Sequence, residues 1–143
     1  MQVFIIGSPL ETAKALDKRR LNKQIIECEQ ILNAILGFSK SWANHPCTIQ
    51  YREHIVWLFC YQSCLRSYME YISGKVSHLS AIEKFNEVCE KCTPNFHTQD
   101  YFDNMKRRLY TKNHEHYKQW ENLGESYENW YWIDNKWKIY KQK

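Results

Sequence analysis

Apolar residues recur at steps of three and four through the first third of the chain, at Leu21, Ile25, Cys28, Leu32 and Ile35. With 3.6 residues per helical turn, these positions fall on one stripe, which is typical of a helix that packs against a core. The pattern predicts one helix over residues 9–36, which Gly37 ends. The preceding segment QVFII is apolar and β-prone but too short to classify, and Gly-Ser-Pro terminates it.

Two later segments also carry helical patterns. Residues 48–73 include the run IVWLFCY, which is apolar on every side and predicts a central buried helix closed by Gly74. Residues 101–120 predict a further helix. The stretch 128–143 mixes aromatic and basic residues without a clear period, so we expect it to pack on the body of the protein as a tail.

A short helix is predicted between these segments. Ser80 and Glu83 have the spacing of a capping box, which indicates where the helix begins. Thr93-Pro94-Asn95 breaks it. Its turns are expected to bury Ile82, Phe85 and Val88.

Composition agrees with these patterns. Hydrophobic residues make up 43% of the 143 residues, which is ordinary for a globular protein. There are only four Gly and three Pro, and this scarcity of helix breakers favours helices. We predict a mainly α fold: a compact single-domain helical bundle over residues 1–143, with a short non-helical amino-terminal segment and an aromatic carboxy-terminal tail. No internal repeat or low-complexity linker indicates a second domain.

The start MQVFIIGSPLE lacks the basic region and long apolar run of a secretory signal, and no stretch of about 18 apolar residues occurs. We therefore expect no membrane contact and a cytoplasmic protein, located at the nucleoid or nucleus when bound to DNA. The six cysteines should be reduced and mostly buried, with Cys60 and Cys64 in the core. Cys89 and Cys92 form C-x-x-C near His97, but no second pair has zinc-ligand spacing, so we predict no metal site.

Motifs of several common classes are missing. The chain has no G-x-x-x-x-G-K-S/T, G-x-G-x-x-G, H-E-x-x-H or G-x-S-x-G. This argues against the nucleotide-binding, zincin and hydrolase classes that those motifs mark. The net charge of +4 is uneven: residues 14–23 hold five Lys and Arg against one acid, and residues 104–143 hold nine against five.

The first candidate for chemistry is Glu27, which helical geometry places in one band with Arg20, Lys23 and Gln30, away from the apolar stripe. One interpretation is an exposed face in which Lys23 and Glu27, four residues apart, form an ordinary salt bridge; the pattern alone favours this. The other is a carboxylate kept charged by cations, which accepts a proton or stabilises a developing positive charge.

The second candidate is the aromatic tail. Interleaved rings and cations are typical of surfaces that stack on bases while neutralising phosphates, and Trp130, Tyr131, Lys136 and Trp137 have this character. The alternative, equally supported, is that the tryptophans cover the core. The cluster Lys106-Arg107-Arg108 and Lys112 fit phosphate contacts or a solvated face, and His45 fits a phosphate or base contact or, better, a helix cap.

The block A-x-x-L-D-x-x-R-L-x-K-Q-x-x-E-x-x-Q-I-L, which follows MQVFII and a turn, resembles the pyrimidine dimer DNA glycosylase family, and most of all its less characterised branch. The resemblance continues through HPCTIQYREH and LYTKNHEHY into the tail, so it spans nearly the whole chain, although only the first block is specific. It implies a small helical enzyme without a cofactor, which flips out a nucleotide and attacks the sugar C1′ with its terminal α-amine.

The resemblance assigns two catalytic residues. The resulting Schiff base would proceed by β-elimination to strand cleavage, with Met1 supplying the amine and Glu27 supporting the sugar chemistry. An α-amine has a pKa of about 7.7–8.0 against about 10.4 for lysine, so about a tenth of it is neutral at pH 7. Gln2 is bulky, so Met1 is expected to be retained.

The resemblance also implies a DNA surface, whose predicted members are Arg19, Arg20, Lys23, His45, Lys106, Arg107, Arg108, Lys112, Trp130, Tyr131, Lys136 and Trp137. Arg20, Ile26 and Gln30 depart from the residues that dimer-specific members carry there, so the lesion is left open. We expect a monomer acting on double-stranded DNA with a damaged or modified base or an abasic site. Two alternatives are a non-catalytic nucleic-acid-binding helical domain and a protein-interaction domain that docks through its tail.

Overall fold

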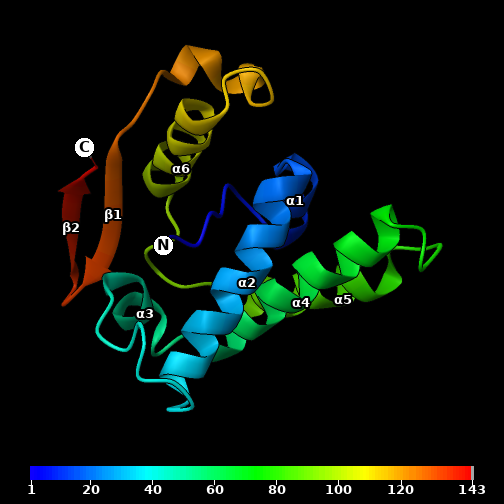
Figure 1. Cartoon of the computed structure of the whole chain (residues 1–143), viewed down its shortest axis with the longest axis horizontal. Helices are drawn as coiled ribbons and strands as arrows, with labels where there is room; N and C mark the ends of the chain where they lie inside the picture. The colour runs from blue at the N-terminus through cyan, green and yellow to red at the C-terminus, as the bar shows by residue number, and fades with distance from the viewer. Residues whose placement is uncertain (143) are drawn as a thin grey trace.

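The computed structural model describes residues 1–142 and is mainly helical (Figure 1), which confirms the predicted fold class. Its elements are α1 (Pro9–Ala15), α2 (Lys18–Ile35), α3 (Pro46–Tyr51), α4 (Ile55–Ile72), α5 (Ser80–Lys91), α6 (Gln99–Lys112), the 3-10 helix η1 (Lys118–Leu123), and the strands β1 (Glu128–Ile133) and β2 (Lys136–Lys141). None of the helices in this part of the chain combines the length and apolar character that a membrane span needs.

The helix predicted over residues 9–36 is two helices. Leu16 adopts an extended conformation and buries its side chain, and Asp17 caps α2 by accepting a hydrogen bond from the Arg20 N–H at 3.2 Å. The continuous helix was wrong because a good N-cap and a buried leucine favour a break here over one more turn. The end at Gly37 is confirmed: its φ of +82° belongs to the left-handed region that glycine adopts without strain.

The helix predicted over residues 48–73 is also two helices, α3 and α4, separated by residues 52–54. His45 caps α3, and Pro46 starts it at a position where no backbone donor is needed. Helix α4 is buried on one face only, since Val56 and Phe59 are 59% and 57% exposed, so the prediction of a helix buried all round was wrong. Its predicted end at Gly74 is confirmed.

Helix α5 begins at Ser80, but Leu79 occupies the cap position and no side chain caps the helix. The predicted capping box was therefore wrong. Of the three residues expected inside, Ile82 is buried, Phe85 is half-buried and Val88 is exposed. The helix packs mainly on α4, and its buried residues are Ile82 and Cys89.

After η1 the chain forms an antiparallel hairpin of β1 and β2, where we expected a tail without a clear period. Asp134 and Asn135 link the strands with φ values of +56° and +59°, the conformation of the two-residue turns that match strand twist. Trp132 faces Trp137 across the strands. The expectation that the tryptophans pack on the body holds, because Trp130, Trp132 and Trp137 lie against the core.

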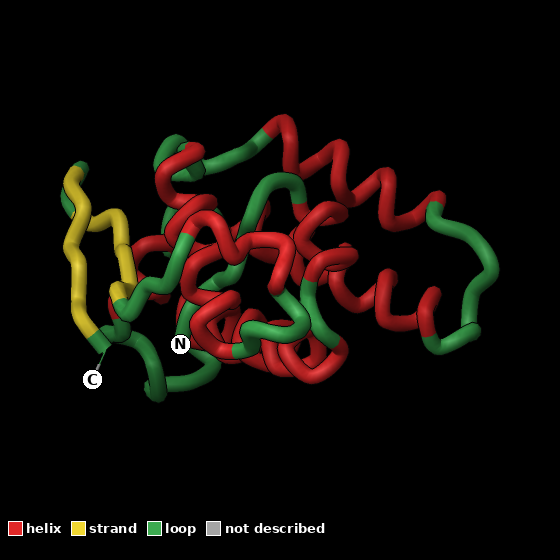
Figure 2. Tube along the Cα trace, turned by 90° about the horizontal axis from the view of Figure 1, so that it is seen from above, coloured by secondary structure: helices red, strands yellow, loops and turns green. Residues whose placement is uncertain are grey.

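The hairpin and the loop between α4 and α5 lie at opposite ends of the molecule (Figures 1 and 2). The core between them includes stacked rings of Tyr51, Trp57 and Tyr61. All six cysteines are free and five are buried, Cys60 and Cys64 among them, as expected; Cys92 is half-buried.

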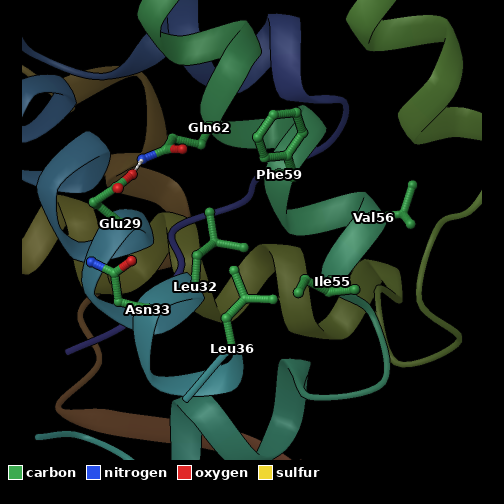
Figure 3. Close-up of a pocket in the computed structure, with 8 residues that line it drawn as sticks. All are labelled: Glu29, Leu32, Asn33, Leu36, Ile55, Val56, Phe59 and Gln62. Carbon is green, nitrogen blue, oxygen red and sulfur yellow. Dashed lines mark hydrogen bonds between the residues drawn. The ribbon is translucent and has the colours of Figure 1, made fainter. Parts of the chain in front are cut away.

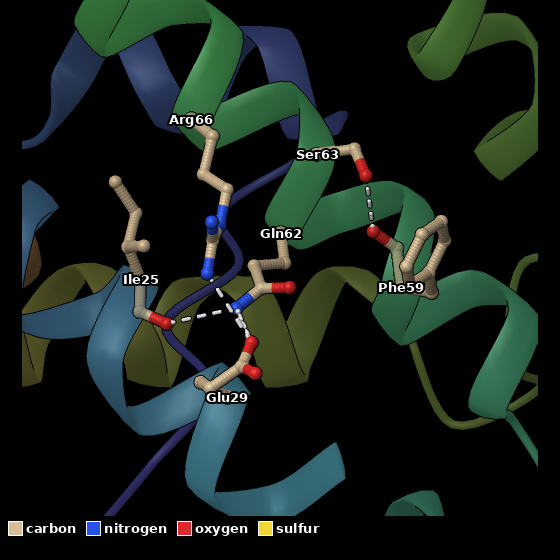
Figure 4. A network of polar contacts seen from close by, with 6 residues as sticks. All are labelled: Ile25, Glu29, Phe59, Gln62, Ser63 and Arg66. Carbon is tan, nitrogen blue, oxygen red and sulfur yellow. Dashed lines mark hydrogen bonds and ion pairs between the residues drawn. The ribbon is translucent and has the colours of Figure 1, made fainter.

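Between α2 and α4 the surface carries an apolar pocket of about 320 Å³, into which Leu32, Leu36 and Ile55 project (Figure 3). A polar network closes one end of it. Gln62 donates to the Glu29 carboxylate at 2.8 Å, and Arg66 pairs with the same carboxylate at 3.2 Å (Figure 4). These contacts hold α2 against α4 and fix the helix that carries Glu27.

Candidate active site

The amino-terminal segment is extended and buried, yet within residues 1–142 it pairs with neither β1 nor β2. Its backbone groups are satisfied by side chains instead. The Gln24 side chain donates to the Gln2 carbonyl at 2.9 Å and accepts from the Phe4 N–H, and the Tyr61 hydroxyl donates to the Phe4 carbonyl at 2.7 Å. Because buried backbone groups must be paired, these helix-borne side chains determine where the segment lies.

Glu27 faces this segment and not the solvent. Its side chain belongs to a residue only 8% exposed, and it accepts a hydrogen bond from the Gln2 N–H at 3.3 Å. None of the ion pairs in residues 1–142 joins Glu27 to Lys23. The interpretation of an exposed salt bridge, which the pattern alone favoured, was therefore wrong, because the amino-terminal segment covers this face of α2.

A small pocket of about 150 Å³ opens where the terminus meets α2, α6 and the hairpin. It is lined by Met1, Gln2, Phe4, Arg20, Lys23, Glu27, Arg108, Lys112, Asn129 and Gln142. Met1 and Glu27 thus border the same space, although no ion pair joins them within the described residues. The fold thus brings Met1 and Glu27 to one pocket, and two residues that share a catalytic role must lie close together in this way.

Cations gather along one rim of this pocket. A neighbouring pocket of about 280 Å³ is lined by Arg19, Arg20, Lys23 and Lys112 together with Asp17, Asn113 and Tyr117. Asp17 is already engaged as the α2 cap and as acceptor of the Tyr117 hydroxyl. Four of the predicted DNA-binding side chains therefore form one positively charged surface beside Met1 and Glu27, which suits an anion such as phosphate.

Two of the cations near the pocket have lowered pKa values. Burial, followed by repulsion from Arg108, Arg20 and Lys23, lowers the pKa of Lys112 to about 8 against an opposing effect of Glu27. Burial also lowers the pKa of Arg108. The Arg108 guanidinium, only 3% exposed, donates to Asn129 Oδ1 at 3.1 Å and to the Ser126 carbonyl at 3.2 Å, so it joins α6 to the hairpin.

Other predicted residues lie away from the pocket. Arg107 donates to the Leu123 carbonyl at 2.9 Å, and Lys106 pairs with Asp103 at 4.0 Å, so the expected basic run does not act as one cluster. Lys136 is exposed at the turn of the hairpin. His45 accepts from the Cys47 N–H at 3.1 Å as the cap of α3, and its pKa is lowered by burial and by the charge of the chain terminus.

The aromatic residues of the hairpin divide into two groups. Trp137 stacks on Tyr101 with ring centroids 5.2 Å apart and contacts Trp130 at 5.5 Å, so these rings pack on α6. Tyr131 is 4% exposed and its hydroxyl donates to the Met1 carbonyl at 3.0 Å. Tyr131 thus contacts Met1, the residue that carries the candidate nucleophile. The sequence did not predict this contact.

Some residues of the site were not predicted at all. Gln24 is a fully buried polar residue of α2. Its position beside the apolar stripe is the one feature of the sequence that could have predicted its burial. Asn129 and Gln142 line the pocket from the hairpin and had no signal, because the hairpin itself was not foreseen. Within residues 1–142, no group of three or more His, Cys, Asp or Glu side chains is arranged to hold a metal ion.

The family model described as pyrimidine dimer DNA glycosylase matches residues 1–71. The chain belongs to this family. Searches of curated proteins and of solved structures found no match. Membership in the pyrimidine dimer DNA glycosylase family supports a repair function of the DNA glycosylase type.

The residues matched to the pyrimidine dimer DNA glycosylase family run from Met1 through most of α4. They contain both Met1 and Glu27 and the side chains that hold the terminus, Gln24 and Tyr61. The remaining wall of the pocket comes from α6 and the hairpin, which lie outside the match.

Proposed function

We propose that this protein is a DNA glycosylase with AP lyase activity, in which the Met1 α-amine is the nucleophile and Glu27 the supporting acid and base. Its substrate is double-stranded DNA with a damaged base, such as a pyrimidine dimer, or with an abasic site. The single observation that carries the proposal is that Met1 and Glu27 line one pocket beside a rim of cations. Family membership supports it independently.

The reaction begins with the neutral amine of Met1 attacking the sugar C1′, and the base leaves with the electrons of the glycosidic bond. Loss of the amine proton and opening of the sugar ring, with a proton delivered to O4′, give an iminium between Met1 and C1′. A carboxylate stabilises such a cation, and once it has accepted the proton lost by the amine it can deliver that proton to O4′ as a carboxylic acid. Glu27 is the carboxylate that borders this pocket.

Strand cleavage follows from the same intermediate. Removal of a C2′ proton breaks the C3′–O bond by β-elimination, and the 3′ phosphate leaves with the electron pair. Water then hydrolyses the imine, which frees the amine. Arg20, Lys23 and Lys112 suit the phosphate that leaves, because a cation at a developing anion lowers the barrier.

The test is borohydride reduction on duplex DNA with one abasic site, which converts an imine into a stable covalent adduct. We expect an adduct with the protein whose terminus is free and none when a permanent extension precedes Met1. An adduct of full yield with the extension in place would rule out the Met1 amine.

Glu27→Gln tests the acid. It should leave the dissociation constant for DNA within about threefold while slowing cleavage by about a hundredfold or more, since general acid–base catalysis contributes about 10²–10⁴. Glu29→Gln is the matched control: it lies on the same helix, but its carboxylate pairs with Arg66 outside the pocket. Equal losses of binding and cleavage in Glu27→Gln would contradict a catalytic role.

The two alternatives have distinct outcomes in the same assays. Salt-sensitive DNA binding with no trapping would indicate a non-catalytic binding domain. No DNA affinity at low salt would leave a protein-interaction domain.

A further inference from the structure

The peptide plane between Met1 and Gln2 is held from both sides. Its carbonyl accepts a hydrogen bond from the Tyr131 hydroxyl at 3.0 Å, and its N–H donates to Glu27 at 3.3 Å. Because the peptide unit is planar, two such bonds fix its orientation. The α-amine is attached one carbon beyond this plane, so only rotation within Met1 itself remains free.

The next peptide unit is held as well. The Gln24 side chain donates to the Gln2 carbonyl, and Gln24 has no exposed surface. Buried hydrogen-bonded groups of this kind have few alternative partners, so the chain leading to the terminus is restrained over its first residues.

Tyr131 is itself rigidly placed. It lies in β1 opposite Lys138, packs its ring 5.8 Å from that of Tyr140, and meets the His45 ring edge-on at 6.0 Å. The hydroxyl therefore links the hairpin to the first residue of the chain, which is 130 residues away in sequence, and the position of the hairpin restrains Met1.

We propose that Tyr131 is a positioning residue that orients the Met1 α-amine toward the pocket, with Gln24 fixing the following peptide. This inference rests on the proposed function and names the device that makes the amine an oriented nucleophile. Tyr131 does not stack on DNA, since its ring is buried. Correct orientation matters because a displacement of about 1 Å can cost a reaction about a hundredfold.

The test is Tyr131→Phe, which removes one oxygen and keeps the ring. At saturating abasic-site DNA, we expect the single-turnover rate of borohydride-trapped adduct formation to fall by about tenfold to a hundredfold. The dissociation constant for duplex DNA with an uncleavable tetrahydrofuran site should stay within about twofold, because the hydroxyl faces Met1 and not the rim of cations. This split between rate and affinity is one that a merely structural role would not produce.

Two matched variants complete the series. Tyr140→Phe removes a hydroxyl from a ring that is 48% exposed on the neighbouring strand, and it should behave as the parent protein. Tyr61→Phe removes the bond to the Phe4 carbonyl, three residues farther from the amine, and should have a smaller effect on rate than Tyr131→Phe. All rates are to be compared well below every variant's melting temperature.

A second readout does not depend on catalysis. The chain has three methionines, so ¹³C-methyl labelling gives three signals. Tyr131→Phe should shift or sharpen the Met1 signal as that residue gains freedom, and leave Met69 and Met105 unchanged.

The outcomes separate the two proposals. A parent protein that never traps abasic DNA overturns the proposed function, while the methionine signals still test the hydrogen bond. A parent that traps, with Tyr131→Phe reacting at the same rate, overturns the positioning role alone. Parallel losses of rate, affinity and melting temperature in Tyr131→Phe would also overturn it, because they would mark Tyr131 as a packing residue.

Discussion

The Gln2 N–H donates to the Glu27 carboxylate at 3.3 Å, so Glu27 holds the peptide that follows the terminal amine and forms no ion pair with that amine within residues 1–142. Met1 and Glu27 nevertheless line the same small pocket. The register of the chain against α2 therefore decides whether the amine is free to react.

Shortening the chain by one residue should abolish this arrangement. Gln2→Ala places a small residue after Met1, so methionine removal is expected and residue 2 becomes the terminus. Its ammonium would then lie where the Gln2 N–H now contacts Glu27, and an opposite charge at that distance favours the protonated form. We expect the rate of borohydride trapping at pH 7 to fall by about tenfold or more.

The control is Gln2→Leu, which retains the initiator methionine because leucine is bulky. Mass spectrometry of the intact proteins distinguishes the two termini. Gln2→Leu should trap at close to the parent rate, and a processed Gln2→Ala that does the same would show that the register of the terminus is unimportant.

Much of the site was predictable because it lies on a regular helix. The spacing of Arg20, Lys23 and Glu27 sets them on one band whatever else the chain does, and the structure places them along one pocket. The spacing could not predict which part of the chain packs against this face of α2. An extended segment covers Glu27, and its burial depends on side-chain bonds from Gln24 and Tyr61 that no local pattern encodes.

The hairpin shows the opposite case. Asp134-Asn135 between two aromatic stretches is a turn signal, but six-residue strands of alternating large rings have no clear apolar face to read. The breaks at Asp17 and at residues 52–54 were missed for a similar reason, since helical periodicity continues across them. At Asp17, local capping chemistry and not the apolar stripe decides where α2 begins.

Lys23 should contribute to DNA binding through charge alone. It is exposed on the rim of both pockets, so Lys23→Ala should weaken binding to any duplex and reduce the slope of log K against log salt by about one. Lys75→Ala is the control, because that exposed lysine lies in the loop between α4 and α5, at the end opposite the hairpin. An unchanged salt slope in Lys23→Ala would show that no phosphate binds there.

Lys112 should make DNA binding depend on pH. Its pKa of about 8 in the free protein means that it is charged at pH 7 and mostly neutral at pH 9. Binding of phosphate requires the charged form, so the dissociation constant should rise as pH increases through 8, by up to about tenfold at pH 9. Lys112→Met should bind more weakly at pH 7 and lose this dependence, whereas Lys112→Arg should bind well at both values.

Only one thiol should react quickly in the native protein. Cys92 is half-buried, while the other five cysteines are buried and burial raises the pKa of Cys47 and Cys64 to about 12. A disulfide reagent such as dithionitrobenzoate should therefore titrate one fast thiol at pH 8 and six in denaturant. Cys92→Ser should leave none fast; several fast thiols in the parent would contradict the packing of α4 against α5.

His97 should make the fold sensitive to acid. Its ring lies edge-on to Trp57 at 4.6 Å, its Nε2 is 2.9 Å from the Tyr51 hydroxyl, and burial lowers its pKa to about 3, with a smaller effect of His54. This pKa lies below the value of about 6.5 in the unfolded state. Between these two pH values, His97 is therefore protonated in the unfolded protein and neutral in the native protein. Stability is therefore complete above pH 6.5 and should fall by up to about 1.4 kcal/mol per pH unit as the pH drops toward 3.

Urea unfolding at pH 7, 6 and 5 measures this slope. His97→Phe keeps an aromatic ring in the cluster but cannot be protonated, so it should cost about 1–2 kcal/mol at pH 7 through the lost hydrogen bond and then lose less stability on acidification. Part of the slope should remain, because the pKa values of His45 and His54 are lowered too. His78→Phe changes an exposed histidine and should retain the parent slope; if His97→Phe retains it as well, the ring is protonated inside the fold and the cluster around it is open to water.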